Sequence, residues 1–206
     1  MKFNCEKALL QNAISVTSRA VAQKSSIPAL EGLLLHAEEE LTVSGYNMQT
    51  GIRAKVSASV ETKGDIVLNA RLFGDIIRRM PDDVVTFSVS DKMQVHLSCG
   101  DADFEIPGLS AADYADLPEV EDEYPVSIQR KVLKAMIEEV AFAVSTNESR
   151  PVHTGALFEI GEGGLTMAAV DGFRLAVRRE PLEKLEGGSF SFVAPGSALN
   201  EVKGIC

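Results

Sequence analysis

The chain has 206 residues, a formal net charge of −10, 45% hydrophobic residues and no tryptophan. This length allows one large or two small domains. No apolar run approaches the roughly 18 residues of a membrane-spanning helix, and the N-terminus has no apolar signal segment, so we expect a soluble, cytoplasmic protein. The net charge alone argues against nucleic-acid binding, but much of the acid lies in 38–40 and 113–123, which leaves room for a local basic face.

In chain order, the first half predicts strands alternating with helices. Apolar residues recur at i, i+4, i+7 and i+11 from Leu9, which predicts an amphipathic helix over 6–22. Three strands follow within 29–56, joined by a polar corner and an Asn-containing turn. A second amphipathic helix is expected over 69–80. Alternating or continuous apolar runs predict further strands at 2–5, 64–68, 85–89, 93–99 and 102–106.

The second half repeats this order. A strand-like run at 126–129 precedes a helix over 130–145, whose Leu133 lies 124 residues after Leu9. The stretch 152–179 parallels 29–56, with Gly155 answering Gly32 and Phe173-Arg174 answering Ile52-Arg53. A strand within 188–193 and a helix within 195–206 close the match. A repeat of this size indicates two copies of one domain.

The copies predict an α+β fold of repeated β-α-β-β-β units, with helices on one face and antiparallel sheets on the other. We expect domain 1 at 1–107 and domain 2 at 126–206, the second lacking its last strands. The segment 108–125 contains proline, is acidic and has no periodicity, so it is interpreted as an interdomain linker.

Residues with chemical potential are scattered. Three cysteines lie far apart, which favours buried or idle thiols over a disulfide framework. The three histidines lack metal-ligand spacing, and the Gly-rich stretch 161–164 is more typical of a hairpin corner than of a phosphate loop. Asp171 and Arg174 bracket an Asp-Gly turn but have no adjacent nucleophile–base pair. We expect no catalytic residue, no metal and no cofactor.

Several longer motifs occur in a fixed order: "SSIPAL", "GDIVLNARLFGDIIRRMP", "FEIPGLSAADYADLP", "ESRPVHTGALFEI" and "AAVDGFRLAV". Together they resemble the bacterial DNA polymerase III beta subunit family, the sliding clamps, from Met1 through Cys206. The resemblance implies the DNA-clamp fold and a processivity factor that encircles duplex DNA and tethers the replicative polymerase. Full-length members form a ring-shaped homodimer of three-domain subunits. By this likeness domain 3 is absent here, and we expect the 206-residue chain not to close a ring.

The resemblance also implies a pocket that takes short linear motifs of the replicative polymerase, the clamp loader and repair proteins. Two of its positions depart from the family, since His153 stands where an apolar residue is usual and Phe173 where histidine is common. The competing interpretation is that Val170 and Leu175 are sheet core and Arg174 is a solvated residue. The positions that match the pocket are His153, Val170, Gly172, Phe173, Arg174 and Leu175.

Four positions match the family's DNA contacts. They are Lys24, Arg71, Asn147 and Arg150. For each cation the alternative is a solvated surface charge. Two other functions stay open: a peptide-binding module that recruits clamp partners without encircling DNA, and an enzyme that uses Asp171, Arg174 and His153.

Overall fold

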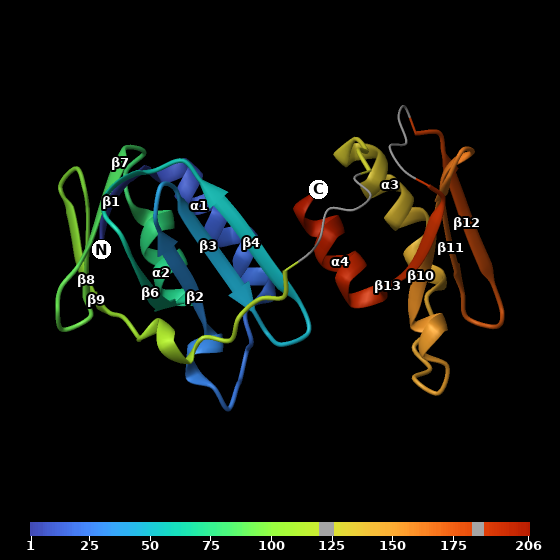
Figure 1. The fold of residues 1–206 in the computed structure, drawn as a ribbon, viewed down its shortest axis with the longest axis horizontal. Coiled ribbons are helices and arrows are strands. Elements are labelled where there is room, and N and C mark those ends of the chain that lie inside the picture. Colours follow the sequence, from blue (N-terminus) through green and yellow to red (C-terminus); the bar gives the residue numbers. More distant parts are fainter. Residues whose placement is uncertain (120–125, 183–187) are drawn as a thin grey trace. The chain divides into compact units, whose positions relative to one another are not determined.

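The computed structural model describes residues 1–119, 126–182 and 188–206. The chain divides into two compact units, Met1–Glu119 and Val120–Cys206. Both are α+β, with antiparallel sheets and helices packed on them, as the sequence predicts (Figure 1).

The first unit contains two sheets and two α-helices. One sheet has the strand order β4-β3-β2-β6 and the other β5-β1-β7-β8-β9. In chain order the elements are β1 (Lys2–Glu6), α1 (Lys7–Thr17), the 3-10 helices η1 (Ser18–Ala20) and η2 (Pro28–Glu31), β2 (Gly32–Ala37), β3 (Leu41–Tyr46), β4 (Gly51–Val56), β5 (Ser59–Thr62), β6 (Gly64–Asn69), α2 (Ala70–Arg79), β7 (Val84–Val89), β8 (Gln94–Cys99), β9 (Ala102–Pro107) and η3 (Ala111–Asp113).

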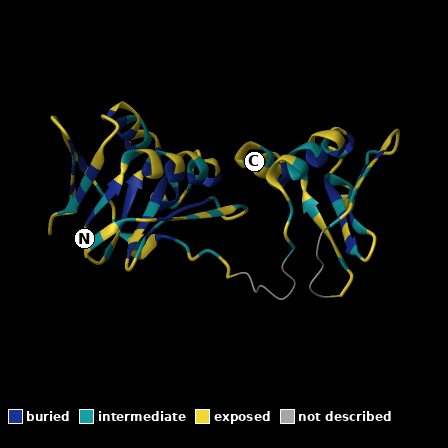
Figure 2. Ribbon diagram, turned by 90° about the horizontal axis from the view of Figure 1, so that it is seen from above, coloured by how far each residue is buried: buried dark blue, intermediate teal, exposed yellow. Residues whose placement is uncertain are grey.

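The main core of the first unit lies between its helices and both sheets. Helix α1 packs on β3 and β4, while α2 packs on β2 and β6. The Phe87 ring stacks on Phe3 with centroids 4.5 Å apart, and Phe73 of α2 meets it edge-on at 6.3 Å. Figure 2 shows the buried faces of the helices and strands turned toward one another. The contacts among these three rings therefore pack the β1–β7 pair against α2.

In its described residues, the second unit contains one sheet, with the order β12-β11-β10-β13, and two α-helices on one of its faces. Helix α3 packs on β11 and β12, and α4 packs on β10 and β13. The elements are α3 (Arg130–Val140), the 3-10 helices η4 (Ala141–Ala143) and η5 (Pro151–Thr154), β10 (Gly155–Gly161), β11 (Gly164–Val170), β12 (Leu175–Glu180), β13 (Phe190–Pro195) and α4 (Gly196–Ile205).

The helix repeat has a different frame from the one that the sequence suggested. Helix α1 begins at Lys7 and α3 at Arg130, a shift of 130 − 7 = 123 residues. Leu10, Ala13, Ile14 and Thr17 are buried, whereas Leu9 is 43% exposed. The stripe predicted from Leu9 was wrong because leucines occupy both positions 9 and 10. Only contact with the sheet selects between faces that differ by one residue, about 100° of helix rotation.

The strand registers correct one further match. Tyr46 pairs with Gly51, and Val170 pairs with Leu175. Ile52 therefore corresponds to Ala176, so its predicted match to Phe173 was wrong. Phe173 and Arg174 lie in the turn between two strands, where a matching strand position cannot exist.

The strand predicted at 126–129 is not formed. Its counterpart β1 pairs with β5 and β7 in the first unit. The described part of the second unit contains no strand equivalent to either partner, and an extended segment needs a partner to become a strand. The prediction was wrong because local pattern does not supply that partner.

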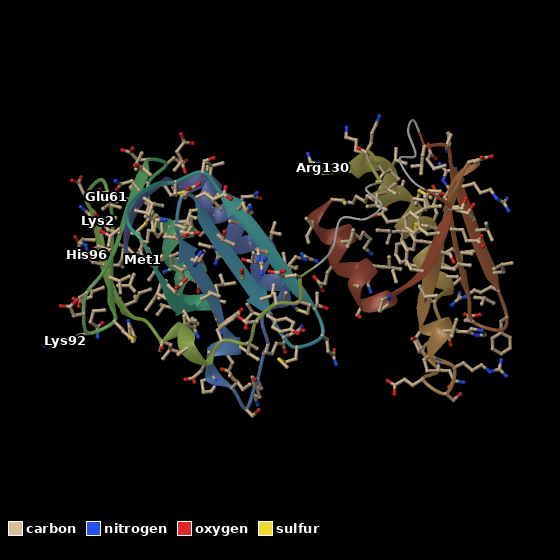
Figure 3. The ribbon with its side chains drawn as sticks, viewed as in Figure 1. Met1, Lys2, Glu61, Lys92, His96 and Arg130 are labelled. Atoms are coloured by element: carbon tan, nitrogen blue, oxygen red, sulfur yellow. The ribbon has the colours of Figure 1, made fainter. Side chains whose placement is uncertain are left out.

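The first unit has several exposed ion pairs on its surface. Lys2 Nζ lies 2.7 Å from Glu61 Oε2 across β1 and β5, and both side chains are nearly half exposed (Figure 3). The hydrogen bond from Lys2 lowers the pKa of Glu61. Pairs this exposed contribute little to stability. Among the described residues, none of the helices has the length and apolarity needed to cross a membrane.

Replacing Phe87 by alanine should destabilise the first unit by about 3–5 kcal/mol, because its ring is fully buried between two other rings. Phe192→Ala is the matched control: Phe192 also stacks, on Phe158, but is 46% exposed. Urea unfolding, followed by NMR signals from each unit, measures both losses. A loss at Phe87 no larger than that at Phe192 would contradict this account of the core.

Candidate functional site

An apolar groove lies on the sheet of the second unit, on the face opposite α3 and α4. Its volume is about 280 Å³. The residues that face the helices, such as Phe158 and Met167, belong to the core. Most of the strand residues that line the groove are their neighbours in the alternation, and Ala169 belongs to both sets. The lining residues are Val152, His153, Gly155, Leu157, Ala168, Ala169, Val170, Leu175 and Val193.

The strand registers explain how these residues meet. Leu157 of β10 stands opposite Ala168 of β11 and opposite Val193 of β13. Val170 stands opposite Leu175 at the end of the β11–β12 pair. Cross-strand neighbours on one face are close enough to form a continuous apolar surface. Four strands therefore build the floor of the groove.

A 3-10 turn forms one rim. Pro151 starts η5, where its fixed φ suits the first helical position. The His153 amide donates to the Arg150 carbonyl at 2.9 Å, and the His153 carbonyl accepts from the Ser145 amide at 2.9 Å. The backbone at His153 is thus held on both sides, which fixes its side chain at the groove.

The Asp171 side chain organises the four-residue turn between β11 and β12. Its Oδ1 accepts from the Phe173 amide at 3.1 Å and from the Arg174 amide at 3.2 Å, and its Oδ2 accepts from Arg174 Nε at 2.7 Å. The Phe173 amide is the largest cause that lowers the pKa of Asp171, and Arg174 adds to it. Gly172 takes a φ of +91° here, a region that glycine occupies without strain.

The first unit contains the same turn without the ion pair. Asn47 Oδ1 accepts from the Gln49 amide at 3.0 Å and from the Thr50 amide at 2.7 Å, and Met48 takes a φ of +70°. The shared role of Asn47 and Asp171 is that of an Asx turn. The carboxylate of Asp171, which accepts from two backbone amides, therefore has a structural role in this turn.

Arg174 connects the turn to η4, the 3-10 helix that follows α3. Its guanidinium carbon lies 5.4 Å from the centroid of the Phe142 ring, a cation–π distance. The side chain remains 57% exposed. Arg174 is therefore a solvated residue anchored by Asp171 and Phe142.

The structure brings together only part of the predicted pocket. His153, Val170 and Leu175 line the groove, whereas Gly172, Phe173 and Arg174 do not. Phe173 is fully exposed, because the Asx turn directs the tip of the hairpin away from the sheet. Sequence reasoning missed Leu157, Ala168 and Val193 among others. The available signal was that "GALFEI" and "GLTMAAV" are apolar on both faces, which is unusual for a sheet with one solvated face.

Two of the predicted DNA contacts lie on the first unit. Lys24 is exposed in the loop between η1 and η2, and Arg71 is exposed in the first turn of α2. A surface hollow of about 520 Å³ is lined by Gln23, next to Lys24, and by Arg71. The fold thus places this loop beside the start of α2.

The other two lie in one loop of the second unit. Asn147 Oδ1 accepts from the Ser149 amide at 3.0 Å and from its hydroxyl at 2.7 Å, and the Arg150 amide donates to the Asn147 carbonyl at 3.2 Å. Both Asn147 and Arg150 are exposed. With the helix shift of 123, Asn147 occupies the position of Lys24 (24 + 123 = 147), so two predicted contacts are equivalent positions of the repeat.

No group of three histidine, cysteine or acidic side chains in the described ranges is arranged to hold a metal ion.

Comparison with known proteins assigns both units to one family. The family model described as "DNA polymerase III beta subunit, N-terminal domain" matches residues 1–118, and the model of the central domain matches residues 127–206. The chain belongs to the DNA polymerase III beta subunit family. It is 33% identical to the beta sliding clamp of Halalkalibacterium halodurans and 31% identical to that of Bacillus subtilis, over its whole length in each case.

Solved structures of beta subunits share the fold. The DNA polymerase sliding clamp of Bacillus subtilis has a TM-score of 0.90 at 30% identity, and the beta subunit of Streptococcus pyogenes has 0.89 at 28% identity. Both comparisons cover 100% of this chain and 56% of the other. The chain spans 57% of the length of the two curated beta clamps that it matches.

Substitutions at Asp171 should separate its turn role from its charge. Asp171→Asn keeps an oxygen that accepts from both amides, as Asn47 does, and should leave the turn intact. Asp171→Ala removes the acceptor and should loosen the Phe173 and Arg174 amides. Hydrogen exchange at these two amides measures the difference. Equal exchange in the alanine variant and the parent chain would contradict the turn role.

The same turn should depend on pH in one direction. Because the pKa of Asp171 is lower in the folded chain, its stabilising effect is present above the ordinary aspartate pKa and is lost as pH falls through the lowered value. Amide shifts of Phe173 and Arg174 should follow that titration, while Asp171→Asn should remove it.

Proposed function

We propose that this chain supplies the first two domains of a DNA sliding clamp, a non-enzymatic processivity factor that encircles duplex DNA and tethers the replicative polymerase. The observation that carries the proposal is the ordered match of the N-terminal and central family domains, together with relatives named beta sliding clamp. In this proposal 1–107 and 126–206 are the clamp domains and 108–125 joins them. Bacterial DNA is replicated in the cytoplasm, which is the location we propose for this protein.

Charge supports a sliding role. A clamp must surround DNA without being trapped on it, and each phosphate contact adds salt-dependent affinity. The chain carries 30 acidic and 20 basic residues, and this excess of acid does not suit tight binding of DNA by an extended basic surface. Lys24, Arg71 and Arg150 are exposed cations that suit weak phosphate contacts, and Asn147 adds a neutral donor.

The groove supports partner recruitment. An apolar concavity with a few polar groups at its rim suits the apolar side chains of a short linear peptide. We propose that the replicative polymerase, the clamp loader and repair proteins present such peptides to it. His153, Val170 and Leu175 would contact the peptide directly. Gly172, Phe173 and Arg174 would act from the adjoining turn.

One observation favours a second candidate, a peptide-binding module that recruits clamp partners without encircling DNA. Every residue that lines the groove belongs to the second unit. This arrangement is compatible with peptide recruitment by the second unit alone. DNA retention distinguishes this function from the first.

The double variant Lys24→Ala, Arg71→Ala should weaken DNA retention in the full-length clamp, because it removes two exposed cations from one surface. Folding stability should change by no more than about 0.5 kcal/mol, as for other exposed substitutions. Lys63→Ala, Lys92→Ala is the matched control, since it removes the same charge from exposed positions outside the helices. Gel filtration of clamps loaded on circular DNA measures retention in low salt. Equal retention by both double variants would remove Lys24 and Arg71 from the DNA surface.

Leu175→Ala should lower the affinity for a labelled polymerase peptide by about 10-fold or more, since apolar anchors carry most of such binding. Arg174→Ala should cause a smaller loss, because Arg174 lies outside the lining. Val177→Ala is the control: it lies two residues along the same strand, is also partly exposed and does not line the groove. Fluorescence anisotropy titration gives the three affinities. An unchanged curve for Leu175→Ala would exclude the groove as the peptide site.

A further inference from the structure

In the first unit, the face that corresponds to the groove is covered by the chain itself. Residues 109–117 follow β9 and lie over β2, β3 and β6. Tyr114 is only 7% exposed, in a cluster separate from the main core. The buried members of that cluster are Ala29, Leu30, Tyr46, Val67 and Tyr114. We call residues 109–117 the strap.

Three contacts hold the strap. The Val67 amide donates to the Leu109 carbonyl at 3.0 Å, and the Leu109 amide donates to the Val67 carbonyl at 2.9 Å, which extends the edge strand β6 by one bridge. The Tyr114 hydroxyl donates to the Ser44 carbonyl at 3.2 Å. Burial raises the pKa of Tyr114 to about 12, so the hydroxyl keeps its proton at neutral pH. Leu117 lies against Gly51.

The strand registers identify the equivalent positions in the second unit. Leu34 stands opposite Ser44 and Val67, as Leu157 stands opposite Ala168 and Val193. Continuing along the strands, Tyr46 corresponds to Val170, Gly51 to Leu175 and Leu30 to His153. Besides Leu175, five positions of the second unit thus have a counterpart in the first, and all five line the groove. Their first-unit counterparts are Leu30, Leu34, Ser44, Tyr46 and Val67. The groove is thus the site of the strap, left open in the described second unit.

Two differences show what the open site accepts. Val170 is smaller than Tyr46, which leaves space for an additional aromatic ring. Leu175 replaces Gly51, and its side chain takes the place that Leu117 occupies in the first unit. The edge strand β13 offers the backbone of Val193, which is 40% exposed, as β6 offers that of Val67. The groove therefore keeps a free backbone that can form the bridge and the space that Tyr114 occupies in the first unit. It lacks the space that Leu117 occupies there.

We infer that the groove of the second unit binds an extended acidic segment of the same chemistry as the strap. The segment bridges the backbone of Val193 and places a tyrosine in the groove, with its hydroxyl donating to the Ala168 carbonyl. This deepens the proposed function, on which it rests, by naming the class of peptide. Addition of a strand-like segment to a free sheet edge is an established mode of peptide recognition.

Charge agrees with this occupant. Tyr114 of the strap is flanked by Asp113 and Asp116, and residues 108–118 contain no lysine or arginine. Arg150 is exposed at the start of η5 and has no ion pair within the described ranges. An acidic segment entering past η5 would meet this cation.

The test supplies the strap in trans. A synthetic peptide of residues 108–118, "GLSAADYADLP", is titrated into the 206-residue chain and followed by amide NMR shifts. Saturable shifts are expected at Ala168, Val170 and Val193, with a weak dissociation constant on the order of 0.1–1 mM because a free peptide loses its flexibility on binding. Ser44 and Val67 should not shift, since their site is already covered.

Matched peptides and one protein variant examine the tyrosine. The Tyr114→Phe peptide should bind a few-fold more weakly, and the Tyr114→Ala peptide should lose at least about 10-fold, since an aromatic anchor carries most of the contact. Val170→Tyr restores the side chain found at Tyr46, which packs in one cluster with Tyr114 in the first unit, and should strengthen binding of the parent peptide. No shifts, shifts at Ser44 and Val67 instead, or equal binding by the alanine peptide would each overturn the inference.

This outcome is separable from that of the proposed function. If a polymerase peptide binds the groove and the strap peptide does not, the inference fails while the proposed function stands. If the strap peptide binds and the clamp neither retains DNA nor binds the polymerase peptide, the proposed function fails while the groove chemistry stands.

Discussion

Each four-stranded sheet has two apolar faces, and its helices can cover only one. Leu33, Leu35 and Val43 face the helices of the first unit, while Leu34 and Tyr46 face the other way. Apolar surface exposed to water costs roughly 25 cal/mol per Å², so a second cover is favoured wherever one can reach. The first unit provides that cover with Tyr114 and its neighbours. On the second unit, the same face forms the groove. The strap of the first unit and the groove of the second therefore both follow from the uncovered apolar face of the sheet.

The turn at Asp171 illustrates how local chemistry supports the site without forming part of it. Asn47 and Asp171 each satisfy two backbone amides, so both units close the β3–β4 and β11–β12 hairpins in the same way. The carboxylate adds a charge that binds Arg174, and Arg174 in turn lies over Phe142. The hairpin end beside Leu175 is therefore anchored to η4, which stabilises one border of the groove.

The charges on the chain act at short range. At physiological salt, interactions between exposed charges are screened within about 8 Å, so an overall excess of acid does not prevent a few cations from contacting phosphate. Many acidic groups already have partners, as Glu61 has Lys2, or serve the backbone, as Asp171 does. The equivalence of Lys24 and Asn147 shows that the repeat presents the same loop twice, once with a cation and once with a neutral amide.

The sequence by itself predicted most of the element order, the repeat and the family, because apolar period, turn residues and ordered motifs are properties of neighbouring residues. It predicted His153, Val170 and Leu175 as groove residues only through family likeness. Tertiary structure decided that Leu10 faces the core while Leu9 does not, that 126–129 has no strand partner among the described residues, and that Phe173 lies outside the groove. It also decided that Tyr114, in a segment interpreted as a linker, is buried. These outcomes depend on contacts between residues far apart in the chain, such as Tyr114 with Ser44, and local pattern carries no record of such contacts.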